Sequence, residues 1–142
     1  MKSSLKQWAA PASVSAAVIL LVTIFLGGCS SPPEKILVTG KVLINDKEAD
    51  GAYVLLYNEG QETEVAAASA RTINDGSFKL EVATPGNYLV TLMWPKKVMD
   101  DGALIEGDDR FQGRYRNPQK PVAKIEIHEG ENSLEPFTLK AR

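Results

Sequence analysis

The sequence contains few of the residues on which enzymes and disulfide-stabilised domains depend. Its 142 residues include one cysteine, Cys29, and one histidine, His128. A single cysteine excludes an intramolecular disulfide, so stability has to come from packing. His128 falls in a polar turn after an apolar run, and no serine stands in a Gly-x-Ser-x-Gly motif. We therefore expect no catalytic residues and no cofactor, and we predict that the protein is not an enzyme.

Charge is absent from residues 8–33, a stretch that follows the two lysines Lys2 and Lys6. Its apolar core covers residues 16–26 and leads into Leu26-Gly27-Gly28-Cys29. This layout resembles the signal peptide and lipobox of a bacterial lipoprotein. The resemblance implies that the chain is cut before Cys29 and that this cysteine carries a diacylglycerol and a palmitate-type acyl chain. The alternative is an uncleaved membrane anchor, because a membrane-spanning helix needs about 20 mostly apolar residues.

The lipobox divides the chain into three parts. We expect residues 1–28 to be the signal peptide, residues 29–35 to be the lipidated cysteine with a short tether, and residues 36–142 to form one folded domain. In proteins with such signals, an aspartate directly after the cysteine holds the lipoprotein at the inner membrane of some bacteria. This chain has Ser30 at that position. The resemblance therefore implies a lipid-anchored protein of the cell envelope, in the outer membrane.

Positive charge is in slight deficit in the mature part of the chain. It keeps 14 of the 16 basic residues against all 18 acidic ones, a formal charge of −4. Nucleic-acid binding depends mainly on the neutralisation of phosphates by basic side chains. We therefore expect no nucleic-acid partner.

The rest of the sequence alternates apolar and polar residues over short runs, which is typical of half-buried strands. Turn residues separate the runs, and no helical period occurs. The pattern predicts a single antiparallel β-sandwich of seven strands. The seven predicted strands cover residues 36–44, 52–57, 65–72, 78–82, 88–94, 122–127 and 137–139.

Several motifs of the predicted domain resemble the transthyretin-like or carboxypeptidase-regulatory-like family. They are Val38-Thr39-Gly40-Lys41-Val42, Asp50-Gly51-Ala52, Asn74-Asp75-Gly76-Ser77-Phe78 and Pro85-Gly86-Asn87-Tyr88. The resemblance implies a Greek-key sandwich that serves as a stalk, adhesion or accessory module. One branch of that fold is enzymatic and uses histidines, an arginine and a C-terminal Tyr-Arg-Gly-Ser. This chain has a single histidine and carries Thr138-Leu139-Lys140-Ala141-Arg142 in place of that motif, so we do not expect this enzymatic activity.

Residues 95–121 break the alternation and are predicted to form a long loop that is functional or variable. Trp94 at its base, with Phe111, Arg114 and Tyr115 inside it, is a candidate platform for stacking a sugar or peptide. The alternative is that these aromatic side chains only pack the loop against the sandwich.

The same loop is rich in acids, which offer the oxygen ligands that Ca²⁺ prefers. They are Asp100, Asp101, Glu106, Asp108 and Asp109. Their spacing matches no calcium-binding loop, and basic residues follow at once. A loop whose own charges pair with each other is the alternative to a metal site.

Two predicted strands are apolar on both faces. If Val54 and Leu56 point into the core, then Tyr53, Leu55 and Tyr57 point outward, and Leu89 and Met93 do the same on the strand of residues 88–94. Strands of this kind are usually covered on both faces. We expect the long loop to cover part of this surface and the rest to bind a protein partner.

Together these patterns predict a membrane-anchored envelope lipoprotein with a non-enzymatic β-sandwich that binds a protein or supports an assembly. The alternative function is a carbohydrate- or calcium-binding module that uses residues 95–121.

Overall fold

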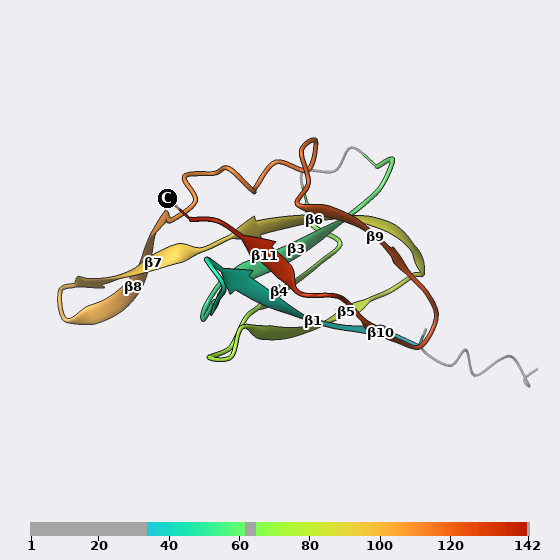
Figure 1. Cartoon of the computed structure of the whole chain (residues 1–142), viewed down its shortest axis with the longest axis horizontal. Helices are drawn as coiled ribbons and strands as arrows, with labels where there is room; N and C mark the ends of the chain where they lie inside the picture. The colour runs from blue at the N-terminus through green and yellow to red at the C-terminus, as the bar shows by residue number, and fades with distance from the viewer. Residues whose placement is uncertain (1–33, 62–64, 142) are drawn as a thin grey trace, which may run out of the picture. The chain divides into compact units, whose positions relative to one another are not determined.

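The computed structural model describes residues 34–61 and 65–141, and within these ranges the chain is all-β (Figure 1). The all-β class predicted from the sequence is therefore confirmed, whereas the predicted number of seven strands is lower than the number of strands in the described residues. The described strands are β1 (Ile36–Ile44), β2 (Lys47–Glu48), β3 (Tyr53–Asn58), β4 (Ala68–Arg71), β5 (Ser77–Val82), β6 (Gly86–Met93), β7 (Pro95–Asp100), β8 (Ala103–Asp109), β9 (Ala123–Ile127), β10 (Glu131–Ser133) and β11 (Phe137–Leu139).

The first sheet is built around β1. Strand β5 pairs antiparallel with β1, from Ile36 opposite Val82 to Lys41 opposite Ser77. β2 turns back from the end of β1 through Asn45 and Asp46, whose φ angles of 51° and 61° are those of a tight hairpin turn. β10 and β11 also pair with β1, and they complete the five-stranded sheet.

The prediction of a purely antiparallel sandwich was wrong for the last two strands. β10 and β11 both run parallel to β1, with Leu37 opposite Glu131 and Val42 opposite Phe137. The reason is that residues 128–130 carry the chain from β9 in the second sheet to the end of the first sheet where β1 begins. The interruption between β10 and β11 contains Pro136, which has no N–H to donate to a ladder.

The second sheet is antiparallel throughout, in the order β4-β3-β6-β9. The long pairing of β3 with β6 runs from Tyr53 opposite Met93 to Asn58 opposite Tyr88. β9 continues the sheet beyond β6, where Gly86 lies opposite Ile127. This pairing fixes which side chains share each face, and it follows the alternation that the sequence predicts.

The core lies between the two sheets. Alternate residues of β1 and β5 supply one half of it, and alternate residues of β3, β6 and β9 supply the other. Val38, Val54, Leu56 and Leu92 are completely buried, and Phe137 of β11 stacks on Phe78 of β5 with ring centroids 6.2 Å apart. Burial of each large aliphatic side chain contributes about 1.5–3 kcal/mol.

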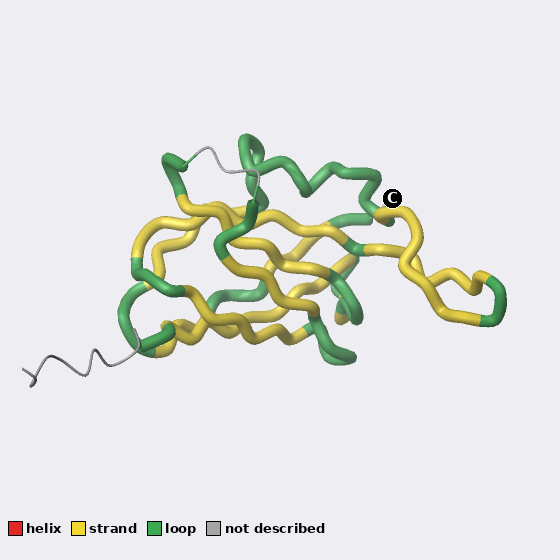
Figure 2. Tube along the Cα trace, turned by 180° about the vertical axis from the view of Figure 1, so that it is seen from behind, coloured by secondary structure: helices red, strands yellow, loops and turns green. Residues whose placement is uncertain are grey.

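The prediction of a long loop over residues 95–121 was wrong for its first half. Residues 95–109 form the β7–β8 hairpin, which extends away from the two sheets in both views (Figures 1 and 2). Its turn is Asp101-Gly102, with φ angles of 44° and 81°, so both central residues have the positive φ that a two-residue hairpin turn requires. The second half, residues 110–122, has no strand and returns along β6, where Tyr115 accepts a backbone hydrogen bond from Leu92.

The residue types of the turn at Asn74-Asp75-Gly76 favour a hairpin between two paired strands of one sheet, but the structure differs. The turn connects β4 of the second sheet to β5 of the first. Asp75 Oδ1 accepts hydrogen bonds from Ser77 N (2.9 Å) and Ser77 Oγ (2.6 Å), and the side-chain bond is the main cause of the lowered pKa of Asp75. The turn residues were recognised correctly, but turn chemistry alone does not say which strands pair.

The predicted signal peptide (residues 1–28), Cys29 and most of the predicted tether (residues 29–35) lie outside the described residues. Within residues 34–61 and 65–141, the structure has no helix long and apolar enough to cross a membrane.

Candidate functional site

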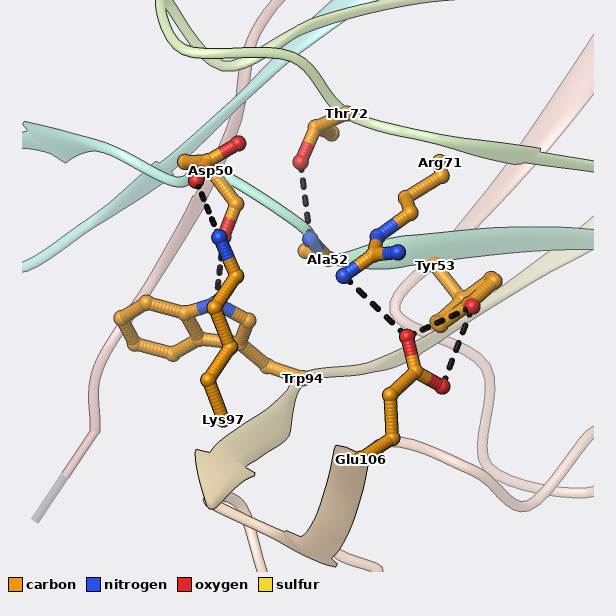
Figure 3. Close-up of polar contacts among 8 residues, drawn as sticks. All are labelled: Asp50, Ala52, Tyr53, Arg71, Thr72, Trp94, Lys97 and Glu106. Carbon is orange, nitrogen blue, oxygen red and sulfur yellow. Dashed lines mark hydrogen bonds and ion pairs between the residues drawn. The ribbon is translucent and has the colours of Figure 1, made fainter. Parts of the chain in front are cut away.

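The candidate site is the junction where the β7–β8 hairpin meets the outer face of the second sheet. Tyr53 and Arg71 lie opposite each other on β3 and β4, and both contact Glu106 of β8 (Figure 3). Tyr53 Oη donates to Glu106, 2.9 Å from Oε1 and 3.1 Å from Oε2. Arg71 Nη2 is 3.1 Å from Glu106 Oε1, and the guanidinium carbon lies 5.4 Å from the centre of the Tyr53 ring. Glu106 thus ties the hairpin to two strands of the sheet.

The hydrogen bond to Glu106 raises the pKa of Tyr53 above its usual 10.0. Burial and the negative charge of Glu106 act in the same direction, because each disfavours a phenolate, and the positive charge of Arg71 opposes them. Tyr53 therefore stays a hydrogen-bond donor at every physiological pH.

A second group of contacts holds the other strand of the hairpin. Lys97 Nζ of β7 lies 2.9 Å from Asp50 Oδ2, and Trp94 Nε1 donates to the Asp50 carbonyl at 2.9 Å (Figure 3). Buried Thr72 holds the loop that contains Asp50 in place. Its hydroxyl accepts a hydrogen bond from Ala52 N at 2.8 Å and donates one to the Ala49 carbonyl. We call the six side chains that make both groups of contacts the hairpin clamp: Asp50, Tyr53, Arg71, Trp94, Lys97 and Glu106.

Asp109 organises the chain where the hairpin ends. Its carboxylate accepts three backbone hydrogen bonds, from Trp94 N at 3.0 Å, Phe111 N at 3.1 Å and Gly113 N at 2.9 Å. Three donors of this kind satisfy one side chain and fix the direction of the following segment. The acidic composition of the region did not distinguish this carboxylate from its neighbours.

The four candidate ligand residues lie together at this segment. Phe111 is only 5% exposed, and its ring centre lies 5.9 Å from that of Trp94, with the two rings tilted by 42°. The Phe111 and Tyr115 rings meet edge-to-face, with their centres 4.9 Å apart. Tyr115 Oη reaches the Lys140 carbonyl at 3.3 Å, and the Arg114 guanidinium lies 5.9 Å from the Tyr115 ring. Arg110 is one of the basic residues that follow the acids in the sequence, and its guanidinium carbon lies 4.3 Å from the centre of the Trp94 ring. These contacts agree with the alternative in which the aromatic side chains only pack the loop against the sandwich.

The five candidate partner residues share the outer face of the second sheet. Register places Tyr53 opposite Met93 and Tyr57 opposite Leu89, with Leu55 between the two tyrosines. All five side chains are half-buried. Thr91, in the middle of this face, is 1% exposed, and its hydroxyl has no hydrogen-bond partner among the described residues. We call Tyr53, Leu55, Tyr57, Leu89 and Met93 the outer apolar face.

The acids considered as calcium ligands are spread along the hairpin. Asp100 and Asp101 lie at its tip, Glu106 is in the hairpin clamp, and Asp109 binds backbone N–H groups. In the part of the chain that the structure describes, no three histidine, cysteine or acidic side chains are grouped in a way that could hold a metal ion.

Comparison with known proteins leaves the chain without an assigned family. No family model matches it, and no curated protein matches it. Similar solved structures include a 9R-lipoxygenase from Cyanothece PCC8801 (TM-score 0.49, 10% identity, 78% of this chain and 17% of that one). A DUF3823 family protein from Parabacteroides merdae has a TM-score of 0.42 and 15% identity, over 75% of this chain and 45% of that one. The major pilin subunit BcpA of Bacillus cereus has a TM-score of 0.46 and 15% identity, over 78% of this chain and 30% of that one. The chain spans less than half the length of each of these three proteins.

Sequence reasoning missed the hairpin clamp. Arg71 and Glu106 are 35 positions apart in the chain and come together only because Glu106 belongs to a strand. The signal that could have revealed this strand was Asp101-Gly102, a strong hairpin turn, between the apolar pairs Val98-Met99 and Leu104-Ile105.

Proposed function

We propose that this protein is a lipid-anchored component of the bacterial cell envelope, whose transthyretin-like β-sandwich binds a protein partner without catalysing a reaction. The observation that carries the proposal is the outer apolar face, in which five apolar side chains from two strands lie side by side and stay half-buried. A contiguous apolar surface on a β-sheet is typical of a protein interface.

The hairpin clamp defines which part of the outer apolar face is available to a partner. Tyr53 is occupied by Glu106 and Arg71, so the part left for a partner centres on Leu55, Tyr57 and Leu89. Charged residues border this part, among them Lys124 of β9, which lies opposite Leu89 and pairs with Glu59 at 2.6 Å. An apolar centre inside a polar rim is the usual arrangement of a protein interface.

The membrane anchor rests on the lipobox. Two or three acyl chains, at about 0.8 kcal/mol per buried CH₂, hold a protein on a membrane far longer than one chain does. Labelling of cells with a palmitate analogue, followed by separation of inner and outer membranes, tests this part of the proposal. We expect label in the outer-membrane fraction and loss of both label and membrane attachment in Cys29→Ser. An unlabelled chain would refute the anchor.

Cross-linking mass spectrometry on native membranes tests the binding surface. The informative variant is Tyr57→Ser with Leu89→Ser, which makes the centre of the outer apolar face polar and leaves the hairpin clamp intact. The matched control is Lys79→Ser, at an exposed position of β5 on the other sheet. We expect one recurrent neighbour in the parent and the control, and its loss in the double variant. A neighbour that persists in the double variant, or no specific neighbour at all, would contradict the proposal.

A further inference from the structure

The β7–β8 hairpin exposes apolar side chains on both of its faces. Met99 and Leu104 lie opposite each other and are 71% and 63% exposed. Val98 and Ile105 form the next pair, on the other face of the ribbon, and are 41% and 43% exposed. An isolated two-stranded ribbon is only marginally stable in water. Uncovered apolar residues at the end of such a ribbon indicate a contact surface.

The pairing of the hairpin shows which backbone groups remain available. The Asp101-Gly102 turn closes on the pair Asp100 and Ala103. In a two-residue hairpin the closing pair is hydrogen-bonded across the ladder, and the bonding direction then alternates along each strand. Val98 therefore directs its backbone groups to β8, whereas Lys97 and Met99 direct theirs outward. In the described part of the chain, β7 pairs only with β8, so this outer edge is open.

We propose that the open edge of β7 pairs with the same edge of a second copy of this chain, antiparallel and centred on Val98. In this register Lys97 of one copy and Met99 of the other form a hydrogen-bonded pair, and the reciprocal pair repeats it. The four outward-directed backbone groups of each copy are thereby satisfied. The two Val98 side chains meet at the two-fold axis in a non-hydrogen-bonded pair, where side chains approach most closely.

Charge complementarity selects this partner. The same register places Lys96 of each copy opposite Asp100 of the other, so each dimer gains two pairs of opposite charge. The strand is therefore complementary to itself in backbone bonding, apolar contact and charge.

A lipid surface fits the hairpin less well. Asp100 and Asp101 stand at the tip, and three further acids against two lysines make the whole hairpin acidic. Such a tip is repelled by anionic lipids. The hairpin also points away from the end of the domain where β1 begins (Figure 1).

Disulfide trapping in native membranes tests the dimer with the full chain. Val98→Cys places two thiols across the two-fold axis, at the separation that a disulfide bridges. The parent chain, with Cys29 alone, is the control for background oxidation, and Lys120→Cys, at an exposed position outside the hairpin, is the control for random collision. We expect a disulfide-linked homodimer for Val98→Cys only, with the bond between the two introduced cysteines identified by mass spectrometry.

Charge reversal then tests the register. In the Val98→Cys background, Lys96→Asp or Asp100→Lys places like charges opposite each other and should lower the yield of dimer roughly two- to fivefold. The combined variant exchanges the two charges and should restore the yield. Dimer no more abundant than in the Lys120→Cys control, no rescue by the combined variant, or trapping of a different protein would each overturn the proposal. None of these results bears on the outer apolar face, whose binding is tested separately.

Discussion

At the scale of single residues, Asp109 shows how one side chain can direct a segment that has no strand of its own. Its carboxylate binds the backbone of Trp94, Phe111 and Gly113, so it connects the end of β6 with the turn that follows β8. The sequence shows this residue only as one acid among several. A carboxylate with several backbone donors is recognisable once the chain is folded, because the donors come from both ends of the hairpin.

We predict that Asp109→Asn lowers the free energy of unfolding by about 1–3 kcal/mol, because an amide nitrogen cannot accept the bonds that one of the carboxylate oxygens accepts. Chemical denaturation measures the change. Asp108→Asn alters the neighbouring, exposed acid and should stay within about 0.5 kcal/mol of the parent. Equal effects of the two substitutions would show that Asp109 does not have this role.

Tyr53 gives a prediction about pH. Its pKa is raised above 10.0, mainly by the hydrogen bond to Glu106. The stability linked to this shift is fully present below pH 10 and is lost as the pH rises through the pKa of the folded protein. Ultraviolet titration of the phenolate, taken as the difference between the parent and Tyr53→Phe, isolates this tyrosine.

In that titration Glu106→Gln should move the pKa of Tyr53 down toward 10.0, because the charged acceptor is lost. An unchanged titration in Glu106→Gln would mean that the contact in the hairpin clamp does not form in solution. Glu126→Gln, on the exposed side of β9, is the matched control.

At the scale of elements, the sequence predicted strands wherever apolar and polar residues alternate. The runs at β1, β3, β5, β6 and β9 were found within one or two residues of the predicted positions. The β7–β8 hairpin was missed because Val98-Met99 and Leu104-Ile105 are adjacent apolar pairs rather than alternating ones. A ribbon with apolar residues on both faces has no two-residue period, so alternation cannot detect it.

Two glycines in turns differ in what surrounds them, although their φ angles are similar, at 75° for Gly76 and 81° for Gly102. A Cβ at Gly76 would lie 2.5 Å from the Val42 carbonyl oxygen, whereas one at Gly102 would meet nothing within 4 Å. Gly102→Ala should cost only the left-handed backbone penalty, roughly 1–2 kcal/mol. Gly76→Ala should cost clearly more, because the connection between the sheets has to shift as well.

Thermal unfolding of the two glycine variants measures this difference. Comparable losses would mean that the turn between β4 and β5 can move away from β1 without strain. A larger loss for Gly102→Ala would contradict the turn geometry described for the hairpin tip.

At the scale of the whole molecule, the all-β fold was predictable, but the pairing of the first sheet was not. Periodicity tells which face of a strand is buried, and it does not tell which strand lies beside it. β10 and β11 have three residues each, and their parallel pairing with β1 depends on where the chain returns from β9. The outer apolar face was predictable because it needed only the phase of two neighbouring strands.

Because both sheets share one core, we predict that replacing a buried leucine lowers the free energy of unfolding far more than replacing an exposed one. Leu56 is fully buried, and Leu56→Ala should lower the free energy of unfolding by about 2–5 kcal/mol. Leu104 is at the hairpin tip, and Leu104→Ala should change it by no more than about 0.5 kcal/mol. Denaturation of both variants, followed by tryptophan fluorescence, gives the comparison. A substantial loss in Leu104→Ala would show that the tip is packed against the sandwich.

The placement of β1 also determines how the domain responds to mechanical force. Its two edges are bonded along nearly the whole strand, by β5 and β2 on one side and by β10 and β11 on the other. Tension applied between residues 34 and 141 pulls β1 and the parallel β11 in opposite directions along their own axes. The hydrogen bonds are then loaded together in shear, whereas tension applied between residues 95 and 109 separates the open ends of the β7–β8 hairpin and breaks its hydrogen bonds one pair at a time. Optical-tweezer experiments should therefore show a much higher rupture force for the first direction, and similar forces would contradict the pairing of β1. A load carried between the start of β1 and the end of β11 would therefore be shared by many hydrogen bonds at once, which makes this the direction in which the domain resists unfolding most.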